Sequence, residues 1–207
     1  MYIPHFFAET DEESLLAFMR EFNFATLVTA ENDFPTATHL PFIIEKRGEK
    51  IVLSAHMAKA NLQWKEFAGK DILVIFQQPH AYVSPLLYAE KVEVPTWNYV
   101  AIHAYGKAKI FESAEENLSL LEKMIAEFDP NYLNTNWREI PDEYKLSRAG
   151  AIVAFEIEVT DLQGKKKLNQ NKDNENGRRV IEAFETSENT GERQIARFMK
   201  EIYDSKS

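Results

Sequence analysis

The sequence predicts a mainly β protein, a mostly antiparallel barrel with peripheral helices packed outside it. Six segments have strand character, and most of them follow one another with links of hairpin length. Only two clear helical patterns come before the last strand, which does not fit the alternating strands and helices of a parallel sheet. We expect residues 1–160 to form the barrel domain. Residues 161–207 are expected to form a C-terminal arm of amphipathic helices, packed on the barrel or on a partner subunit.

The first elements are a helix and three strands. A capping box at residues 10–13 precedes apolar residues at helical spacing and predicts a helix there. Residues 24–29 predict a strand that ends in a turn-rich segment at 31–35. A strand at 36–45 is joined by a short turn to one at 50–55, so this pair predicts a hairpin.

The later elements alternate less regularly. We expect a central apolar strand, a long strand, a capped helix that ends at Asp129–Pro130, and a last strand with alternating apolar residues. A polar, turn-rich stretch then leads to two amphipathic helices. In order, these segments are residues 71–77, 99–112, 113–128, 152–159, 165–179, 180–184 and 193–203.

Composition restricts the function classes. The net charge of −9, from 24 basic and 33 acidic residues, works against nucleic-acid binding through the chain as a whole. The absence of cysteine excludes disulfides, thiolate metal sites and a cysteine nucleophile. The first residues have no signal-peptide pattern and no segment reaches membrane-spanning length, so we expect a cytoplasmic protein with no membrane partner.

The most informative stretch is LSAHMAKANLQW at residues 53–64. We expect a strand that ends at residues 54–56 and turns at once into a short helix carrying Lys59, Asn61 and Gln63. Backbone N–H groups near Ala58 and Lys59, at the positive end of a helix dipole, would then form an anion site with the lysine. An ordinary surface helix with one lysine explains the same residues equally well, and both interpretations stay open.

A second segment places a flat side chain beside polar ones. At residues 94–99, Pro95 would bend the chain and present Thr96, Trp97 and Asn98 at the entrance of the long strand. A tryptophan beside a hydroxyl and an amide suits a flat heteroaromatic ligand. Trp97 as a core residue is the commoner alternative.

Other polar side chains have weaker signals. Gln77 ends the central strand at the expected barrel rim, and Thr38 and His39 interrupt an apolar strand. A plain loop and outward-facing strand positions explain these residues without a ligand. Lys167 and Gln170 lie in the basic stretch after residue 164, which we interpret as a solvated loop. A sharper hypothesis is that they reach the same anion site from a partner subunit.

Several classes of site lack sequence support. The five histidines show no metal-ligand spacing, so we expect no metal site. There is no G-x-S-x-G motif, no P-loop and no G-x-G-x-x-G fingerprint. No acid or base stands out as catalytic; His56, His103 and Tyr105 are the candidates.

Taken together, the chain resembles the PaiB-type FMN-binding negative transcriptional regulators. These belong to the FMN-binding split-barrel superfamily, with pyridoxamine-phosphate oxidases and flavin reductases. Two departures from the family pattern are Gln78, where a glycine is usual, and Asn169, where a serine is usual. The matching blocks are MYIPHFF at 1–7, FATLVT at 24–29, ATHLPF at 37–42, AHMAKANLQW at 55–64, VIFQQPHAYVSP at 74–85, VPTWNYVAIHAYGKA at 94–108 and KLNQNK at 167–172.

The resemblance implies a six-stranded antiparallel split barrel and a homodimer with FMN at its interface. FMN needs charge and amides for its phosphate, a flat face for its ring and donors for the ring edge. Lys59 with neighbouring amides suits the phosphate, and Trp97 suits the ring. The full expected cofactor-binding set is Thr38, His39, His56, Ala58, Lys59, Asn61, Gln63, Gln77, Thr96, Trp97, Asn98, Lys167 and Gln170.

The function implied first is an FMN-binding negative regulator that acts indirectly, since the charge opposes direct DNA binding. The alternative is an FMN-dependent oxidoreductase or flavin reductase that takes electrons from a reduced nicotinamide. A haem-handling split barrel with a histidine ligand is a third hypothesis. Whether the protein is an enzyme stays open at this point.

Overall fold

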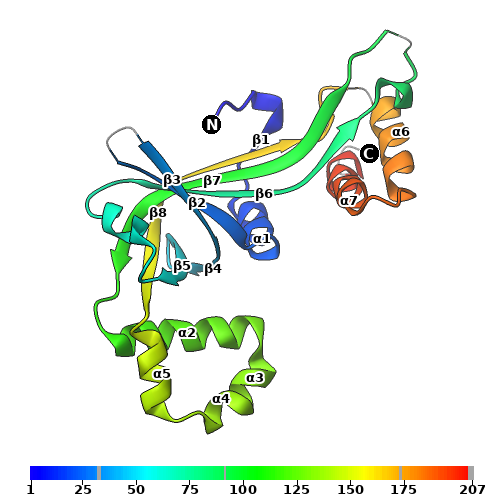
Figure 1. The fold of residues 1–207 in the computed structure, drawn as a ribbon. Helices are drawn as coiled ribbons and strands as arrows, with labels where there is room; N and C mark the ends of the chain where they lie inside the picture. Colours follow the sequence, from blue (N-terminus) through cyan, green and yellow to red (C-terminus); the bar gives the residue numbers. More distant parts are fainter. Residues whose placement is uncertain (32–33, 91, 173, 205–207) are drawn as a thin grey trace. The chain divides into compact units, whose positions relative to one another are not determined.

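The computed structural model describes residues 1–31, 34–90, 92–172 and 174–204 (Figure 1). Its contacts divide the chain into two compact units. The first unit comprises Met1–Leu15, Gln77–Ile102 and the chain from Gln163 onward, and the second comprises Leu16–Phe76 and His103–Leu162. The expected boundary at residue 160 falls close to one of the four points where the chain passes between units, and the other three crossings were not expected.

The described residues contain a mainly β fold, as predicted, with eight strands in one sheet. The order is β3-β2-β6-β7-β8-β5-β4, with β1 paired to β8, and the pairings of β1–β5 are antiparallel. The strands are β1 (Ala8–Glu9), β2 (Phe24–Glu31), β3 (Phe34–Pro41), β4 (Ile43–Arg47), β5 (Lys50–Ala58), β6 (Ile72–Val83), β7 (Thr96–Ile110) and β8 (Ile152–Lys167). The compact apolar strand is central, as expected, because β6 lies between β2 and β7.

The single strand expected at 36–45 is wrong, because the structure has two strands there. The amide of Phe42 donates to the carbonyl of Asn23 at 2.9 Å, and Phe42 belongs to neither strand. β3 pairs with β2, while β4 pairs with β5. The predicted hairpin therefore holds for β4 and β5 only. Residues 32 and 33 of the expected turn lie outside the described ranges.

β8 continues eight residues beyond its expected end at 159, and this corrects the turn-rich interpretation of residues 165–167. Its last part pairs with β1, with Ala8 opposite Lys165 and Glu9 opposite Gly164. Gly164 is needed at this point, since an added Cβ would lie 2.3 Å from the Leu15 side chain. The first basic residues of the stretch are therefore part of the sheet.

The four longer predicted helices are present, and three short α-helices were missed. Ser113 and Glu116 form the predicted capping box of α2. Asp129 follows the last residue of α2, and its side chain accepts from the amide of Tyr132. The same residue therefore ends α2 and caps the start of the next helix. The helices are α1 (Glu12–Glu21), α2 (Ala114–Phe128), α3 (Pro130–Asn134), α4 (Asn136–Glu139), α5 (Asp142–Ala149), α6 (Asn174–Glu185) and α7 (Thr190–Asp204), with 3₁₀ turns η1 (His5–Phe7), η2 (Leu62–Glu66) and η3 (Pro85–Leu87). No helix in the described ranges is both long and apolar enough to cross a membrane.

Each unit has buried side chains of its own. In the first unit α6 and α7 lie side by side (Figure 1) and bury Val180, Phe184, Ile195 and Met199. In the second unit the sheet and its helices bury a larger set. That set includes Leu16, Met19, Leu27, Phe42, Leu53, Phe67, Phe76, Phe155 and Ile157.

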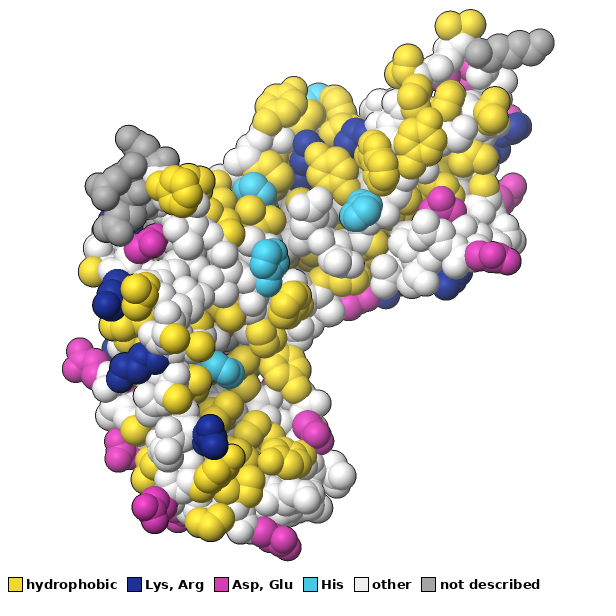
Figure 2. Space-filling model, in the orientation of Figure 1, with side chains coloured by type: hydrophobic (Ala, Val, Ile, Leu, Met, Phe, Trp, Pro, Cys, Tyr) yellow, Lys and Arg dark blue, Asp and Glu magenta, His cyan; other side chains and the backbone are white. Residues whose placement is uncertain are grey.

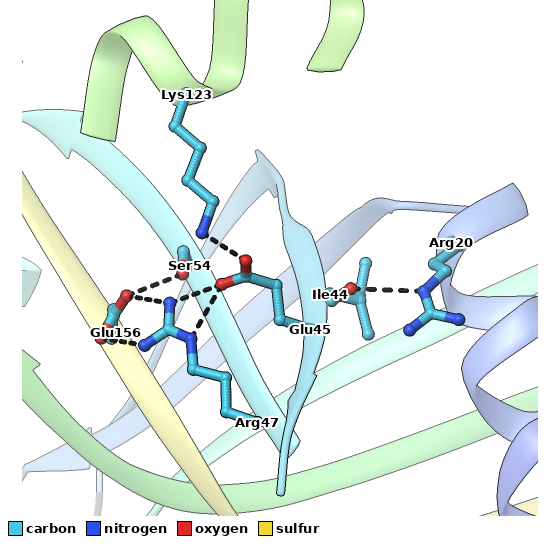
Figure 3. Close-up of polar contacts among 7 residues, drawn as sticks. All are labelled: Arg20, Ile44, Glu45, Arg47, Ser54, Lys123 and Glu156. Carbon is cyan, nitrogen blue, oxygen red and sulfur yellow. Dashed lines mark hydrogen bonds and ion pairs between the residues drawn. The ribbon is translucent and has the colours of Figure 1, made fainter. Parts of the chain in front are cut away.

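An ion-pair network joins α2 to the sheet of the second unit (Figure 3). Arg47 on β4 pairs with Glu45 and with Glu156 on β8, the second contact at 2.6 Å. Lys123 on α2 pairs with Glu45 at 2.5 Å. Hydrogen bonds from Arg47 lower the pKa of Glu156 below its ordinary value, so the carboxylate stays charged at neutral pH.

Candidate functional site

Lys59 follows the end of β5 in the second unit and presents an exposed side chain. It lines a cavity of about 370 Å³ together with Trp64, Phe111 and Asn117. Within the described ranges no ion pair engages its ammonium group. An unpaired, exposed ammonium group beside aromatic side chains can attract an anion.

The expected helix start at this site is wrong in detail. β5 runs on to Ala58, and η2 begins only at Leu62, so Lys59 lies before the helix. The amide of Lys59 donates to the carbonyl of Ala151 at 2.9 Å and is not free for a phosphate. A helix of five residues also has little dipole. An anion site at this position would therefore depend on the lysine charge alone.

The structure brings together three of the predicted residues, Thr38, Asn61 and Gln63. The Thr38 hydroxyl donates to Gln63 Oε1 at 2.5 Å and accepts from Asn61 Nδ2 at 2.9 Å. The amide of Gln63 donates to Asn61 Oδ1 at 3.1 Å, which caps η2. This cluster ties the segment after Lys59 to β3.

Gln63 is a structural residue in this arrangement. Its side chain is 2% exposed, and its Nε2 donates to the Thr29 hydroxyl and to the carbonyl of Thr36, both at 3.0 Å. With Oε1 also occupied, little hydrogen-bonding capacity is left for a ligand. The expected role of Gln63 at a ring edge is therefore corrected to that of a positioning residue.

The two histidines predicted here lie apart from that cluster. His39 is exposed on β3, stacked on Phe24 with ring centroids 6.5 Å apart. His56 lies half-buried under α2, with Nδ1 3.1 Å from the sulfur of Met124. Burial lowers the pKa of His56, so it is neutral at pH 7 and does not add charge at Lys59.

In the first unit, Thr96, Trp97 and Lys167 also come together. The ammonium group of Lys167 donates to the Thr96 hydroxyl and, at 2.6 Å, to the carbonyl of Trp97. Burial lowers the pKa of Lys167, and the nearby charge of Lys165 adds to this effect. Lys167 therefore holds the start of β7 in place, and both of these hydrogen bonds are made within the same chain.

Trp97 itself is 51% exposed, so its alternative role as a core residue is not what the structure shows. Its ring lies 5.6 Å from that of His80 and 5.9 Å from that of Tyr82. The three rings line a cavity of about 500 Å³, which the start of α7 completes. A half-exposed indole in such a cavity can stack on a planar ligand.

The remaining predicted residues of the first unit differ in availability. Asn98 is fully buried and donates to the sulfur of Met199 at 3.4 Å, which corrects its expected role as a ligand donor. Gln170 closes a local turn, accepting from the amide of Leu168 at 2.7 Å. Gln77 is exposed on β6. Of these residues only Gln77 has a free side chain.

Sequence reasoning missed the wall that α7 contributes to the Trp97 cavity. The lining includes Asn189, Thr190, Gly191, Glu192 and Gln194. The expected helix began at residue 193, whereas Asn189 Oδ1 accepts from the amide of Gly191 at 2.8 Å and marks an earlier start. Asparagine ahead of an amphipathic pattern is a helix-capping signal that would have found it.

The two catalytic candidates on β7 form a ring pair. The rings of His103 and Tyr105 lie 6.3 Å apart. Burial lowers the pKa of His103, and its Nδ1 has no hydrogen-bond partner among the described residues. Across the described ranges, no three histidine or acidic side chains gather in a way that could hold a metal ion.

The chain is similar to known proteins over most of its length. A family model described as "Putative FMN-binding domain" matches residues 1–161. "Protease synthase and sporulation protein PAI 2" of Bacillus subtilis (strain 168) is 40% identical over 205 residues, which is 97% of each chain. An uncharacterized protein of Emericella nidulans is 29% identical over 244 residues, again 97% of each chain.

Solved structures show the same fold at low identity. The flavocytochrome Anf3 from Azotobacter vinelandii has a TM-score of 0.60 and 16% identity, covering 78% of this chain and 70% of that one. The FAD and heme binding protein from Mycobacterium smegmatis has a TM-score of 0.56 and 15% identity, covering 77% and 73%. The split-barrel fold predicted from the sequence is thereby confirmed, with eight strands in place of six.

Proposed function

Because this chain belongs to the family of FMN-binding domains, we propose that it is an FMN-binding negative regulator that acts through its flavin or a protein partner rather than by direct DNA binding. The name of the Bacillus subtilis relative refers to a protease synthase and to sporulation, and that relative is similar over nearly its whole length. The regulatory role itself comes from the resemblance of the sequence to FMN-binding negative regulators.

The residues present fit FMN in their chemistry. The exposed ammonium group of Lys59 suits the phosphate, and the exposed indole of Trp97 suits the planar ring. Thr38 and Asn61 hold the chain beside Lys59, and Lys167 holds the backbone at Trp97. Bound FMN would supply a group that accepts and gives electrons. The ring contacts expected from Gln77 and Thr96 remain predictions.

The observation that carries the indirect route is the state of the basic stretch. Lys165 is buried and donates to the carbonyl of Tyr2, and Lys166 pairs with Glu9 at 2.8 Å. Lys172 pairs with Glu93. On the face drawn in Figure 2, the basic side chains are scattered and form no continuous surface. DNA binding needs several free cations on one surface, so this stretch is a poor DNA-binding arm.

We also propose that the protein is a homodimer with FMN at the interface, as the resemblance implies. Light scattering coupled to size-exclusion chromatography measures the mass directly. A mass of two chains supports the proposal, and a mass of one chain over the working concentration range contradicts it.

An FMN-dependent oxidoreductase is the second candidate. It is favoured by the open cavity of about 500 Å³ beside Trp97, which has room for a second planar molecule. Steady consumption of NADH or NADPH by the FMN-loaded protein would establish this activity. If the flavin stays oxidised under those conditions, the oxidoreductase candidate is refuted and only the regulatory proposal stands.

The visible spectrum of the purified protein tests the cofactor first. Flavin bands support the proposal, and a Soret band in their place would point to haem. Lys59→Ala should then weaken FMN binding about 10–100-fold, the value of a lost charge-assisted hydrogen bond. The matched control is Lys109→Ala, another exposed lysine of the second unit. Unchanged FMN affinity in Lys59→Ala would refute the phosphate assignment.

Direct DNA binding is tested by a separate measurement. A gel-shift assay at physiological salt with DNA from upstream of the protein's own coding sequence should show no specific complex. Tight, sequence-specific binding would overturn the indirect route while leaving FMN binding untouched.

A further inference from the structure

We infer that the cavity beside Trp97 binds a planar organic cation, namely a nitrogen heteroaromatic ring that carries a positive charge. This inference rests on the proposed function, because it names the class of second planar molecule that the cavity beside Trp97 would take, and it uses residues of the first unit only. Three features of the cavity favour such a ligand: its aromatic side, its second wall and its charge.

The aromatic side consists of His80, Tyr82 and Trp97. His80 and Tyr82 are alternate residues of β6 and therefore point to the same side of the strand. Trp97 on β7 packs against both, tilted by 55° to the first ring and 69° to the second. Tyr82 and Trp97 are still 46% and 51% exposed, so ring surface is left for a ligand. Aromatic faces attract cations and stack on planar rings.

The opposite wall is held rigidly at the start of α7. Gly191 packs so closely that an added Cβ would lie 2.9 Å from the carbonyl oxygen of His80. Arg193 donates to the carbonyl of Ser187 at 2.6 Å and to the hydroxyl of Thr190 at 3.0 Å. A cavity with walls fixed in this way needs little reordering when a ligand binds.

Charge decides which planar ligand fits. Glu192 lines the cavity, and no lysine or arginine does so among the described residues. Within those same ranges no ion pair engages Glu192. Arg193 is not in the lining, and its guanidinium donates to the carbonyl of Ser187 and to the hydroxyl of Thr190, a lining residue. Lys167 lines a different cavity. A carboxylate that lines the same cavity as aromatic rings favours a cation and disfavours an anion such as a phosphate.

The test is calorimetric titration of the full-length, FMN-loaded protein with three related probes. These are the N-methylnicotinamide cation, neutral nicotinamide and anionic nicotinate. We expect the cation to bind with a Kd at least about tenfold lower than that of nicotinamide, and nicotinate not to bind. In Glu192→Gln the ratio of the Kd of nicotinamide to that of the cation should fall to about two or less. Trp97→Leu should weaken both the cation and nicotinamide.

Glu188→Gln is the matched control, because Glu188 is exposed and precedes α7 but does not line the cavity. It should keep the full preference for the cation. Absence of cation binding, equal affinity for nicotinamide, or an unchanged preference in Glu192→Gln would each overturn the inference. Flavin absorbance, recorded for every variant, shows separately whether FMN binding, and with it the proposed function, has failed.

Discussion

Replacing Gln63 with leucine tests how the segment beside Lys59 is held. The side chain is 2% exposed and makes three hydrogen bonds, to Thr29, Thr36 and Thr38, at 3.0, 3.0 and 2.5 Å. A fourth contact, to the carbonyl of Leu27 at 3.4 Å, is too long to count. At a net value of about 1 kcal/mol for each bond, Gln63→Leu should lower the free energy of unfolding by about 3 kcal/mol.

This loss corresponds to about a 100-fold change in the ratio of folded to unfolded protein and to a Tm lower by about 6–12 °C. Urea unfolding followed by circular dichroism measures it, and the dependence on urea concentration should not change. Gln77→Leu is the control, because Gln77 is exposed and should change stability by less than about 0.5 kcal/mol. A loss below about 1 kcal/mol in Gln63→Leu would refute the positioning role.

Three further perturbations follow from single contacts, each measured by urea unfolding. Gly177→Ala places a Cβ 2.0 Å from the ring of Tyr203 and should cost about 1–3 kcal/mol; a neutral effect would show that α6 and α7 can separate freely. Asn169→Ser should cost about 1 kcal/mol, because a φ of 64° suits asparagine better than serine, and an equal or higher stability would contradict this. Hydrogen bonds from Arg47 lower the pKa of Glu156, so the stability from this pair is present above the ordinary value of 4.5 and is lost as pH falls through the lower folded value. The stability difference between the wild type and Arg47→Met should therefore shrink from about pH 6 to about pH 3, and a constant difference would refute the link.

Local signals in the sequence predicted those elements whose cause is local. The capping box of α2 and the apolar run of β6 are of this kind, because neighbouring residues supply both the pattern and the partner. The division of residues 36–45 into β3 and β4 was not predictable in this way. It depends on the bond from Phe42 to Asn23, a partner 19 residues away that no periodicity in the segment reveals.

The candidate site shows the same division. Residue type and block order identified the FMN-binding family, and the family match confirms it. The binding roles of Lys59 and Trp97 stay predictions, and both side chains are exposed in the structure. Gln63 and Asn98 are both side-chain amides in matching blocks, and residue type alone could not show whether they contact a ligand or the protein itself. Tertiary packing buries both of them, and their side-chain Nε2 and Nδ2 groups donate to partners inside the protein.

The sequence by itself therefore determined the fold class, the family and the kinds of side chain available to the cofactor, since these follow from local pattern and residue chemistry. Only the tertiary structure decided that the LSAHMAKANLQW stretch presents a single lysine charge in place of a helix start. The reason is that the amide of Lys59 is already bonded to Ala151, nearly a hundred residues further along the chain. It likewise decided that α7 closes the Trp97 cavity with Glu192, a contact between residues far apart in sequence.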